Sequence, residues 1–250
     1  MMKILDFDRL SPEEFLNRDI RAEEDVSAAV DGILADVRSR GDAAMRDYTR
    51  RFDGAELKDL WVAAAEFDAA REAVDPCCLE TLKEAAENIR SFHERQKHND
   101  FFLTRGSGVV MGQRWTPVER VGICVPRSPE AFPSTILMNA IPAQIAGVQD
   151  IVIVTPPRRD GTVSPEALMA AELAEVADVF KLGGAQAVAA LAFGTETVPR
   201  VDKIVGPGGV FVATAKRKVF GLVDIDMIAG PSEILVLADG ETDPKWAAAD

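Results

Sequence analysis

The sequence is poor in the residues that build disulfide frameworks and metal sites. It has three cysteines and two histidines among 250 residues, and it contains neither a CxxC nor an HExxH pattern. An odd number of cysteines without paired spacing argues against a disulfide framework and favours a reducing compartment. Zinc sites need several ligands at defined spacing, so zinc cannot be argued from these residues alone.

Long apolar runs and an excess of positive charge are also missing. No stretch of about eighteen apolar residues occurs, and the opening MMKILDFDRLSPEEF carries charges where a signal peptide is continuously apolar. The formal net charge of -13 would repel a phosphate backbone, which binds clustered Lys and Arg. We therefore expect a cytoplasmic protein with no membrane and no nucleic acid as partner. The one basic cluster, Lys216 to Lys218, is interpreted as a solvated helix face.

What the sequence has is 47% hydrophobic residues, which is ample for buried cores. Apolar residues between Val26 and Val37 recur at helical spacing, and Gly41 would end that helix. A second amphipathic helix is predicted from Asp75, followed by proline at the first helical position, to about Lys97. Residues 1–116 are therefore predicted to be a mainly helical N-terminal region.

From Pro117 onward, short apolar runs alternate with alanine-rich helical stretches. The predicted strands are Val121 to Val125, Ile151 to Thr155, Val179 to Leu182, Lys203 to Val205 and Ile234 to Leu237. The predicted helices are Ser134 to Ala146, Ser164 to Ala177, Ala185 to Phe193 and Val210 to Val219. Strict alternation implies parallel strands with right-handed crossovers. Residues 117–239 are thus predicted to be a Rossmann-like α/β domain, an open parallel sheet with helices on both faces.

Residues 240–250 are expected to begin a further, truncated segment. Thr242, Asp243 and Pro244 form a helix-start signal, and the residues after them give under two turns. So short a helix is not stable by itself.

Ligands of an open parallel sheet bind outside the carboxyl ends of its strands. Two glycine-rich loops follow predicted strands there, Gly183-Gly184-Ala185-Gln186 and Gly206-Pro207-Gly208-Gly209. Glycine lets the backbone approach a ligand, and the free N–H groups of a helix start favour phosphate or carboxylate. The alternative is that glycine serves turn geometry alone, since no GxGxxG fingerprint with a following acidic residue occurs.

Two polar residues near these loops are further candidates. The amide of Gln186 could donate to and accept from a cofactor, or it could be an exposed helix residue. Ser232 could hold a polar substrate group, or it could satisfy backbone groups as a cap or turn hydroxyl. No GxSxG pattern surrounds Ser232 and no histidine is nearby, so nucleophilic catalysis by Ser232 is rejected.

In this order, the loops and the segments around them resemble histidinol dehydrogenase. The matching blocks are FHERQ (92–96), GQRWTPVERVGICVP (112–126), STILMNAIPAQIAGV (134–148), GGAQAVAALAFGTETVPRVDKIVGPG (183–208) and DMIAGPSEILVLAD (226–239). The resemblance implies a homodimeric, zinc-dependent enzyme that oxidises L-histidinol to L-histidine in two NAD-linked steps.

The resemblance also implies roles for particular residues. Gln186 corresponds to the glutamine that contacts the dinucleotide, and Ser232 to the serine that contacts the substrate. With the glycine loops, the expected cofactor-binding residues are Gly183, Gly184, Gln186, Gly206 and Gly208. The family's zinc ligands and catalytic residues follow the GPSE strand, beyond Asp250. We therefore expect no catalytic or metal-binding residue in this chain, and no activity from the chain alone.

The chain departs from the family pattern at the first loop. Cys124 stands where a tyrosine is usual, Pro126-Arg127-Ser128 replaces a Pro-Gly-Gly turn, and Gly209 replaces an asparagine. No cofactor contact is assigned to Cys124 or Gly209, and Arg127 is interpreted as a solvated arginine, with pyrophosphate contact as the alternative. Two other functions stay open: a related zinc and NAD dehydrogenase of another alcohol, such as sulfopropanediol, and a catalytically inactive dinucleotide-binding fragment.

Overall fold

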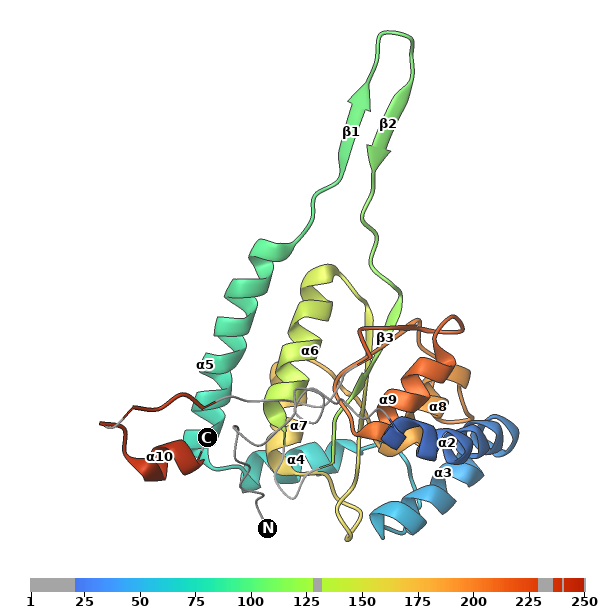
Figure 1. Cartoon of the computed structure of the whole chain (residues 1–250), viewed down its shortest axis with the longest axis vertical. Helices are drawn as coiled ribbons and strands as arrows, with labels where there is room; N and C mark the ends of the chain where they lie inside the picture. Colours follow the sequence, from blue (N-terminus) through green and yellow to red (C-terminus); the bar gives the residue numbers. More distant parts are fainter. Residues whose placement is uncertain (1–20, 128–131, 229–235, 240, 250) are drawn as a thin grey trace, which may run out of the picture.

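The computed structural model describes residues 21–127, 132–228, 236–239 and 241–249. At its centre lies a parallel sheet with the strand order β5-β4-β3-β6-β7 (Figure 1). Its strands are β3 (Arg120–Cys124), β4 (Asp150–Thr155), β5 (Asp178–Lys181), β6 (Lys203–Val205) and β7 (Asp224–Ile225). The predicted Rossmann-like sheet is therefore confirmed. The short β7 was not predicted. The predicted strand from Ile234 to Leu237 lies partly outside the described residues, and Val236 and Leu237 belong to no strand.

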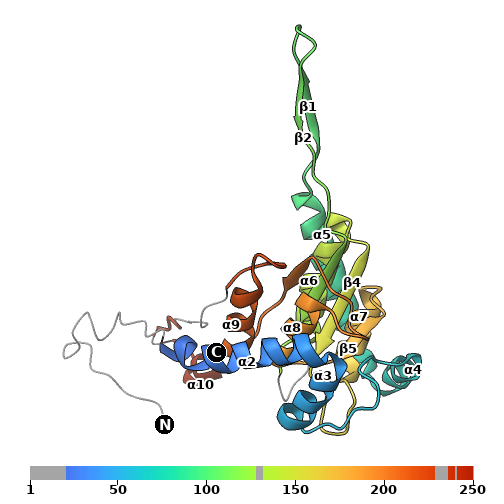
Figure 2. The same cartoon turned by 90° about the vertical axis from the view of Figure 1, so that its right-hand side faces the viewer.

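Helices cover both faces of this sheet, as predicted (Figures 1 and 2). On one face lie α4 (Ala64–Ala73), α5 (Pro76–His93), α6 (Pro133–Ala146) and α7 (Pro165–Leu173). On the other lie α2 (Arg21–Arg40), α3 (Asp42–Tyr48), α8 (Gly184–Phe193) and α9 (Val210–Val219). The shorter elements are the π-helix η2 (Thr49–Asp53), the 3-10 turn η3 (Glu94–Gln96) and α10 (Pro244–Ala249). None of the described helices has the length and apolar content needed to cross a membrane.

The apolar runs of the strands are explained by burial on both sides. In β4, Val152 and Val154 belong to the core under α8, whereas Ile153 belongs to the core under α6 and α7. Successive side chains of a strand point to opposite faces, so a strand covered on both faces must be apolar throughout. All three side chains are at most 1% exposed.

Local signals set the starts of α5 and α7. Asp75 caps α5 by accepting a hydrogen bond from the backbone N–H of Cys77 at 2.8 Å, and Ser164 caps α7 in the same way for Ala167 at 3.2 Å. The helix predicted to reach Ala177 ends at Leu173 instead. Glu175 there adopts a positive φ of 50°, which turns the chain into β5.

The N-terminal helices pack directly on the α/β region. The predicted helix around Val30 and Val37 is α2, and its apolar face is buried against α8 and α9. On the opposite face, α4 packs on α7 and α5 on α6. Both regions thus share the same two cores. The boundary at residue 117 marks a change of sequence pattern, and its status as a domain boundary stays a prediction.

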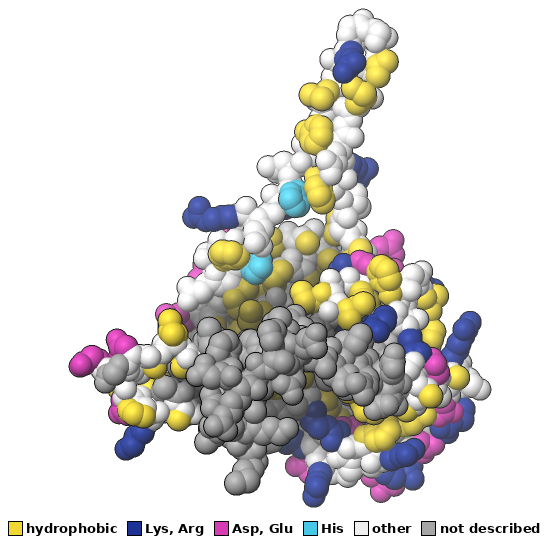
Figure 3. All heavy atoms as spheres, viewed as in Figure 1, with side chains coloured by type: hydrophobic (Ala, Val, Ile, Leu, Met, Phe, Trp, Pro, Cys, Tyr) yellow, Lys and Arg dark blue, Asp and Glu magenta, His cyan; other side chains and the backbone are white. Residues whose placement is uncertain are grey.

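A β-hairpin projects from the body of the molecule, in the region that the sequence pattern predicts to be mainly helical. Its strands are β1 (Phe101–Thr104) and β2 (Val110–Gln113), which pair antiparallel. Both stand clear of the other labelled elements in the two perpendicular views (Figures 1 and 2). Phe102 is 64% exposed and Val110 is 62% exposed, and apolar side chains are visible along the hairpin in Figure 3. The hairpin is the main non-helical element in the N-terminal region.

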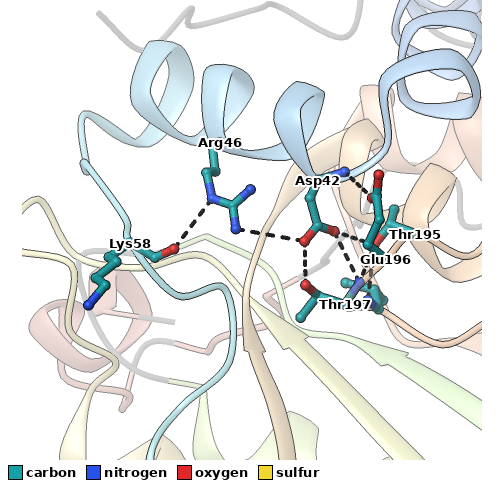
Figure 4. A network of polar contacts seen from close by, with 7 residues as sticks. Asp42, Arg46, Lys58, Thr195, Glu196 and Thr197 are labelled. Carbon is teal, nitrogen blue, oxygen red and sulfur yellow. Dashed lines mark hydrogen bonds and ion pairs between the residues drawn. The ribbon is translucent and has the colours of Figure 1, made fainter.

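A buried carboxylate joins the N-terminal helices to the loop after α8 (Figure 4). Asp42, at the start of α3, accepts hydrogen bonds from the hydroxyl of Thr195 at 2.6 Å and from the backbone N–H of Thr197 at 3.2 Å. The hydroxyl of Thr197 also donates to it. The backbone N–H of Asp42 donates to the carboxylate of Glu196 at 2.8 Å. Segments more than 150 residues apart are thereby fastened together.

We predict that Asp42→Ala lowers the free energy of unfolding by about 1–3 kcal/mol, because the donors of Thr195 and Thr197 lose their acceptor in a partly buried position. Urea unfolding followed by circular dichroism measures the loss. Asp47→Ala is the matched control: Asp47 pairs with Arg40 on the surface, and its removal should cost much less. Equal losses from the two variants would contradict the importance of the Asp42 network.

Candidate functional site

The order of the strands creates a crevice next to β3. From β3 the chain runs through α6, β4 and α7 to β5 on one side, with both helices on one face of the sheet. It then crosses through α8 on the other face to β6, which pairs with the free side of β3. Such a reversal is a topological switch point, and ligands of open α/β sheets bind there, outside the carboxyl ends of the strands.

A cavity of about 470 Å³ occupies this position. Its walls are the loops that follow three strands: residues 124–127 after β3, residues 183–187 after β5 and residues 207–212 after β6. Phe52 and Asp53 of η2 close one side. The size lies within the usual range for small-molecule and cofactor sites.

Two helices begin at the wall of this cavity. The residue that precedes α8 is Gly183 and the residue that precedes α9 is Gly209, and neither helix has a side-chain cap. The first backbone N–H groups of a helix have no partner within the helix, and together with the helix dipole they favour anions. The arrangement therefore suits a ligand that carries phosphate.

The close packing of the loop after β5 on the loop after β4 explains the glycine at position 183. A Cβ atom placed there would lie 2.4 Å from Cγ of Pro156, in the loop after β4. Any larger residue would push the two loops apart. The glycine thus allows the close packing of the two loops. Gly183, Gly184 and Gly208 all line the cavity, as does Gln186, so the structure brings these predicted residues together. Gly206 lies just outside the lining.

Gln186 lies in the first turn of α8 and is only 2% exposed. The interpretation as an exposed helix residue is therefore wrong. Among the described residues, no hydrogen-bond partner of its side chain is present, although the amide has both a donor and an acceptor. A buried amide at a cavity wall is a group that a ligand can satisfy.

Arg127 is held in place at the cavity rim. Its guanidinium forms an ion pair with the buried carboxylate of Asp53 and donates to the backbone carbonyl of Phe52 at 2.8 Å. Its side chain is 55% exposed, so Arg127 is solvated as interpreted, and its guanidinium is in addition anchored to η2. No local sequence pattern indicates this pairing, because Asp53 precedes Arg127 by 74 positions (127 - 53).

Cys124 lies at the end of β3, at the cavity wall, and is buried. Burial raises the pKa of its thiol to about 12. Desolvation disfavours the thiolate, and the nearby positive charge of Lys216 opposes this only in part. The thiol is therefore neutral and unreactive in the folded chain at neutral pH.

We predict that iodoacetamide at pH 8 alkylates the exposed Cys77 of the folded chain well before Cys124, and that urea makes the two rates similar. Mass spectrometry of peptides measures both rates in one sample, so Cys77 is the internal control. The unfolded thiol ionises near 9 and the folded one near 12. The contribution of Cys124 to stability is thus complete below pH 9 and declines as the pH rises from 9 to 12. Equal alkylation rates in the folded chain would overturn this account.

Lys216, in the basic cluster of α9, is buried and not solvated. That part of the sequence interpretation is wrong. Lys218 forms an ion pair with Asp31 of α2 at 2.8 Å. The helix therefore turns one lysine inward and another toward a neighbouring helix, a difference that the spacing of charges alone did not reveal.

The remaining predicted features are the substrate contact of Ser232 and the zinc site of the family. Ser232 lies outside the described residues, so its predicted substrate contact stays a prediction. Within the part of the chain that the structure describes, no three or more His, Cys, Asp or Glu side chains come together in a way that could hold a metal ion. The described residues therefore do not fit a zinc site.

Comparison with known proteins places these features in a family. The family model for histidinol dehydrogenase matches residues 16–250. A histidinol dehydrogenase of Halalkalibacterium halodurans is 52% identical over 94% of this chain and 56% of its own length. One from Listeria innocua is 50% identical over 95% of this chain and 57% of its own length. The chain thus spans about half the length of the curated relatives it matches.

A solved structure agrees with the sequence comparisons. The crystal structure of histidinol dehydrogenase from Elizabethkingia anophelis superposes with a TM-score of 0.82 at 36% identity, and it covers 93% of this chain and 57% of that protein. The residues matched by the family model include the whole of the sheet and the loops that surround the cavity. The chain belongs to the histidinol dehydrogenase family.

Proposed function

We propose that the switch-point cavity binds NAD, and that the protein serves the oxidation of L-histidinol to L-histidine in two NAD-linked steps. The observation that carries the proposal is the convergence of two uncapped helix starts and the buried Gln186 on one cavity of about 470 Å³. The names of the relatives support histidinol as the substrate. The resemblance further supports a cytoplasmic location and a homodimer for the complete protein.

The residues around the cavity would divide the work of holding a dinucleotide. The backbone N–H groups at the starts of α8 and α9 would donate to the pyrophosphate, because their partial positive charge is not used within the helices. The amide of Gln186 would hydrogen-bond a polar group of the cofactor. Phe211, partly exposed at the cavity wall, offers an apolar face for a ring. When bound, NAD would supply the chemistry by accepting a hydride.

Because the described residues do not fit a zinc site, we derive no step through a metal. Proton transfer is likewise assigned to no residue of this chain, because Asp53, the carboxylate at the cavity wall, is paired with Arg127. The two histidines of the chain, His93 and His98, do not line the cavity, and Cys124 is neutral there. This chain is proposed to contribute the cofactor side of the reaction.

We predict that the 250-residue chain binds NAD in a calorimetric titration and that Gln186→Ala raises the dissociation constant by about fivefold, since one lost hydrogen bond corresponds to about 1 kcal/mol. Gln144→Ala is the matched control. Gln144 is a helical glutamine that donates to the carbonyl of Ala174 and does not line the cavity. Its loss should lower stability and leave NAD binding unchanged. If the wild-type chain shows no NAD binding, the proposal fails.

We also predict that the chain, incubated with L-histidinol, NAD and Zn²⁺, produces no NADH above a blank without substrate. The physical reason is that the described residues supply no metal site, and that Asp53, the carboxylate at the cavity wall, is held in an ion pair with Arg127. Absorbance at the nicotinamide band measures the product. Steady, histidinol-dependent NADH formation would show that this chain carries a complete active centre.

A further inference from the structure

The turn after β6 is held by side chains that do not touch the cavity. The peptide N–H of Gly206 donates to Oδ2 of Asp226 at 2.8 Å, and the carbonyl of Gly206 accepts a hydrogen bond from Nζ of Lys216 at 2.9 Å. Lys216 and Asp226 also form an ion pair with each other. The three residues therefore form a closed ring of hydrogen bonds in which both polar groups of Gly206 are used.

The side chains of the ring come from two elements, α9 and the segment that follows β7. Lys216 lies in the last turn of α9, beyond the residues of that helix that line the cavity, and Asp226 follows directly after β7. Lys216 is 3% exposed. Taking a lysine out of water is costly unless it is paired and hydrogen-bonded. Here the ammonium is compensated by the carbonyl of Gly206 and the carboxylate of Asp226.

The backbone conformation of Gly206 and its packing against β3 also restrict the turn. Its φ is +101°, a conformation open to glycine and strained for other residues. A Cβ atom at this position would lie 2.3 Å from the carbonyl oxygen of Cys124, at the end of β3. The turn is thus pressed against the strand next to it. The residues that follow at once, Pro207 and Gly208, line the cavity, and Gly209 precedes α9.

We propose that Lys216 and Asp226 are positioning residues that fix the Gly206-Pro207-Gly208 turn, and with it the start of α9, in the geometry that binds the dinucleotide. This inference rests on the proposed function. Neither side chain lines the cavity, so both act through the backbone of Gly206. Fixing the turn beforehand lowers the entropy lost when a ligand binds.

The test uses Lys216→Met, which keeps an unbranched side chain without the charge, Asp226→Asn, which keeps the shape, and the double variant. NAD affinity is measured by calorimetry for each. We expect the dissociation constant to rise at least tenfold in both single variants. Because the two residues act as one unit, the double variant should lose no more affinity than either single variant.

A second readout follows the turn itself. We expect the amide hydrogens of Gly206 and Gly208, followed by NMR, to exchange with solvent at least tenfold faster in Lys216→Met than in wild type. Asp42→Asn is the matched control, because it disturbs another buried carboxylate network, at the start of α3. That variant should lose stability and keep both the NAD affinity and the exchange rates of the turn.

The outcomes separate this inference from the proposed function. If wild type binds NAD and both single variants bind it equally well, the positioning role is wrong. A loss of affinity in Asp42→Asn equal to that in Lys216→Met would also overturn it, since general destabilisation would then suffice. If wild type does not bind NAD, the proposed function fails, and the exchange rates at Gly206 and Gly208 still decide whether the pair fixes the turn. Unchanged rates in Lys216→Met would overturn the inference.

Discussion

The parallel pairing of β3 with β6 is the interaction on which the site depends. The pairs Gly122 with Ile204 and Ile123 with Val205 join strands that are about eighty residues apart, while β4 occupies the other side of β3. Because the connections to these neighbours run over opposite faces, the loops at their carboxyl ends diverge and leave a crevice. The two helix starts that meet at the cavity follow from that divergence, and Phe52 and Asp53 of η2 close the remaining side.

Three buried charged side chains fix backbone geometry in this chain. The contacts of Asp53 with Arg127 and of Asp42 with its threonines fasten a loop or helix start to a distant segment, and those of Lys216 with Asp226 fix a turn nearby in the sequence. Buried ion pairs add little to net stability, because desolvation offsets much of their attraction. These contacts share a preferred hydrogen-bond geometry, which restricts the arrangement of the backbone that they bind. The apolar cores supply the stability, and these polar contacts select where the loops lie.

The sequence predicted the parts of the fold that depend on local pattern. The runs of β3, β4 and β5 were readable because burial on both faces demands continuous apolar residues, and the helices over 133–146 and 210–219 were readable as helical stretches that alternate with those runs. The candidate loops were found because glycines directly after an apolar strand mark a turn where the backbone can come close to a ligand. Gln186, Gly183, Gly184 and Gly208 indeed line one cavity.

What the sequence could not reveal depends on distant partners. Whether Lys216 is solvated or buried is decided by Asp226 and the carbonyl of Gly206, and whether Arg127 is free is decided by Asp53. The two residues of β7 are too few to show a periodicity. The hairpin was missed because FFLT is apolar without alternation, although the turn residues Arg105 to Gly108 were a usable signal.

The projecting hairpin is expected to open at a lower free energy than the sheet. Two strands without a packed face are only marginally stable in water, and Phe102 and Val110 contribute little burial to hold them. The sheet, by contrast, is covered on both faces. The hairpin can therefore open and reclose by itself at a small fraction of the cost of global unfolding, while the crevice at β3 and β6 stays intact. A protease that needs an extended backbone would cleave the chain in the opened hairpin.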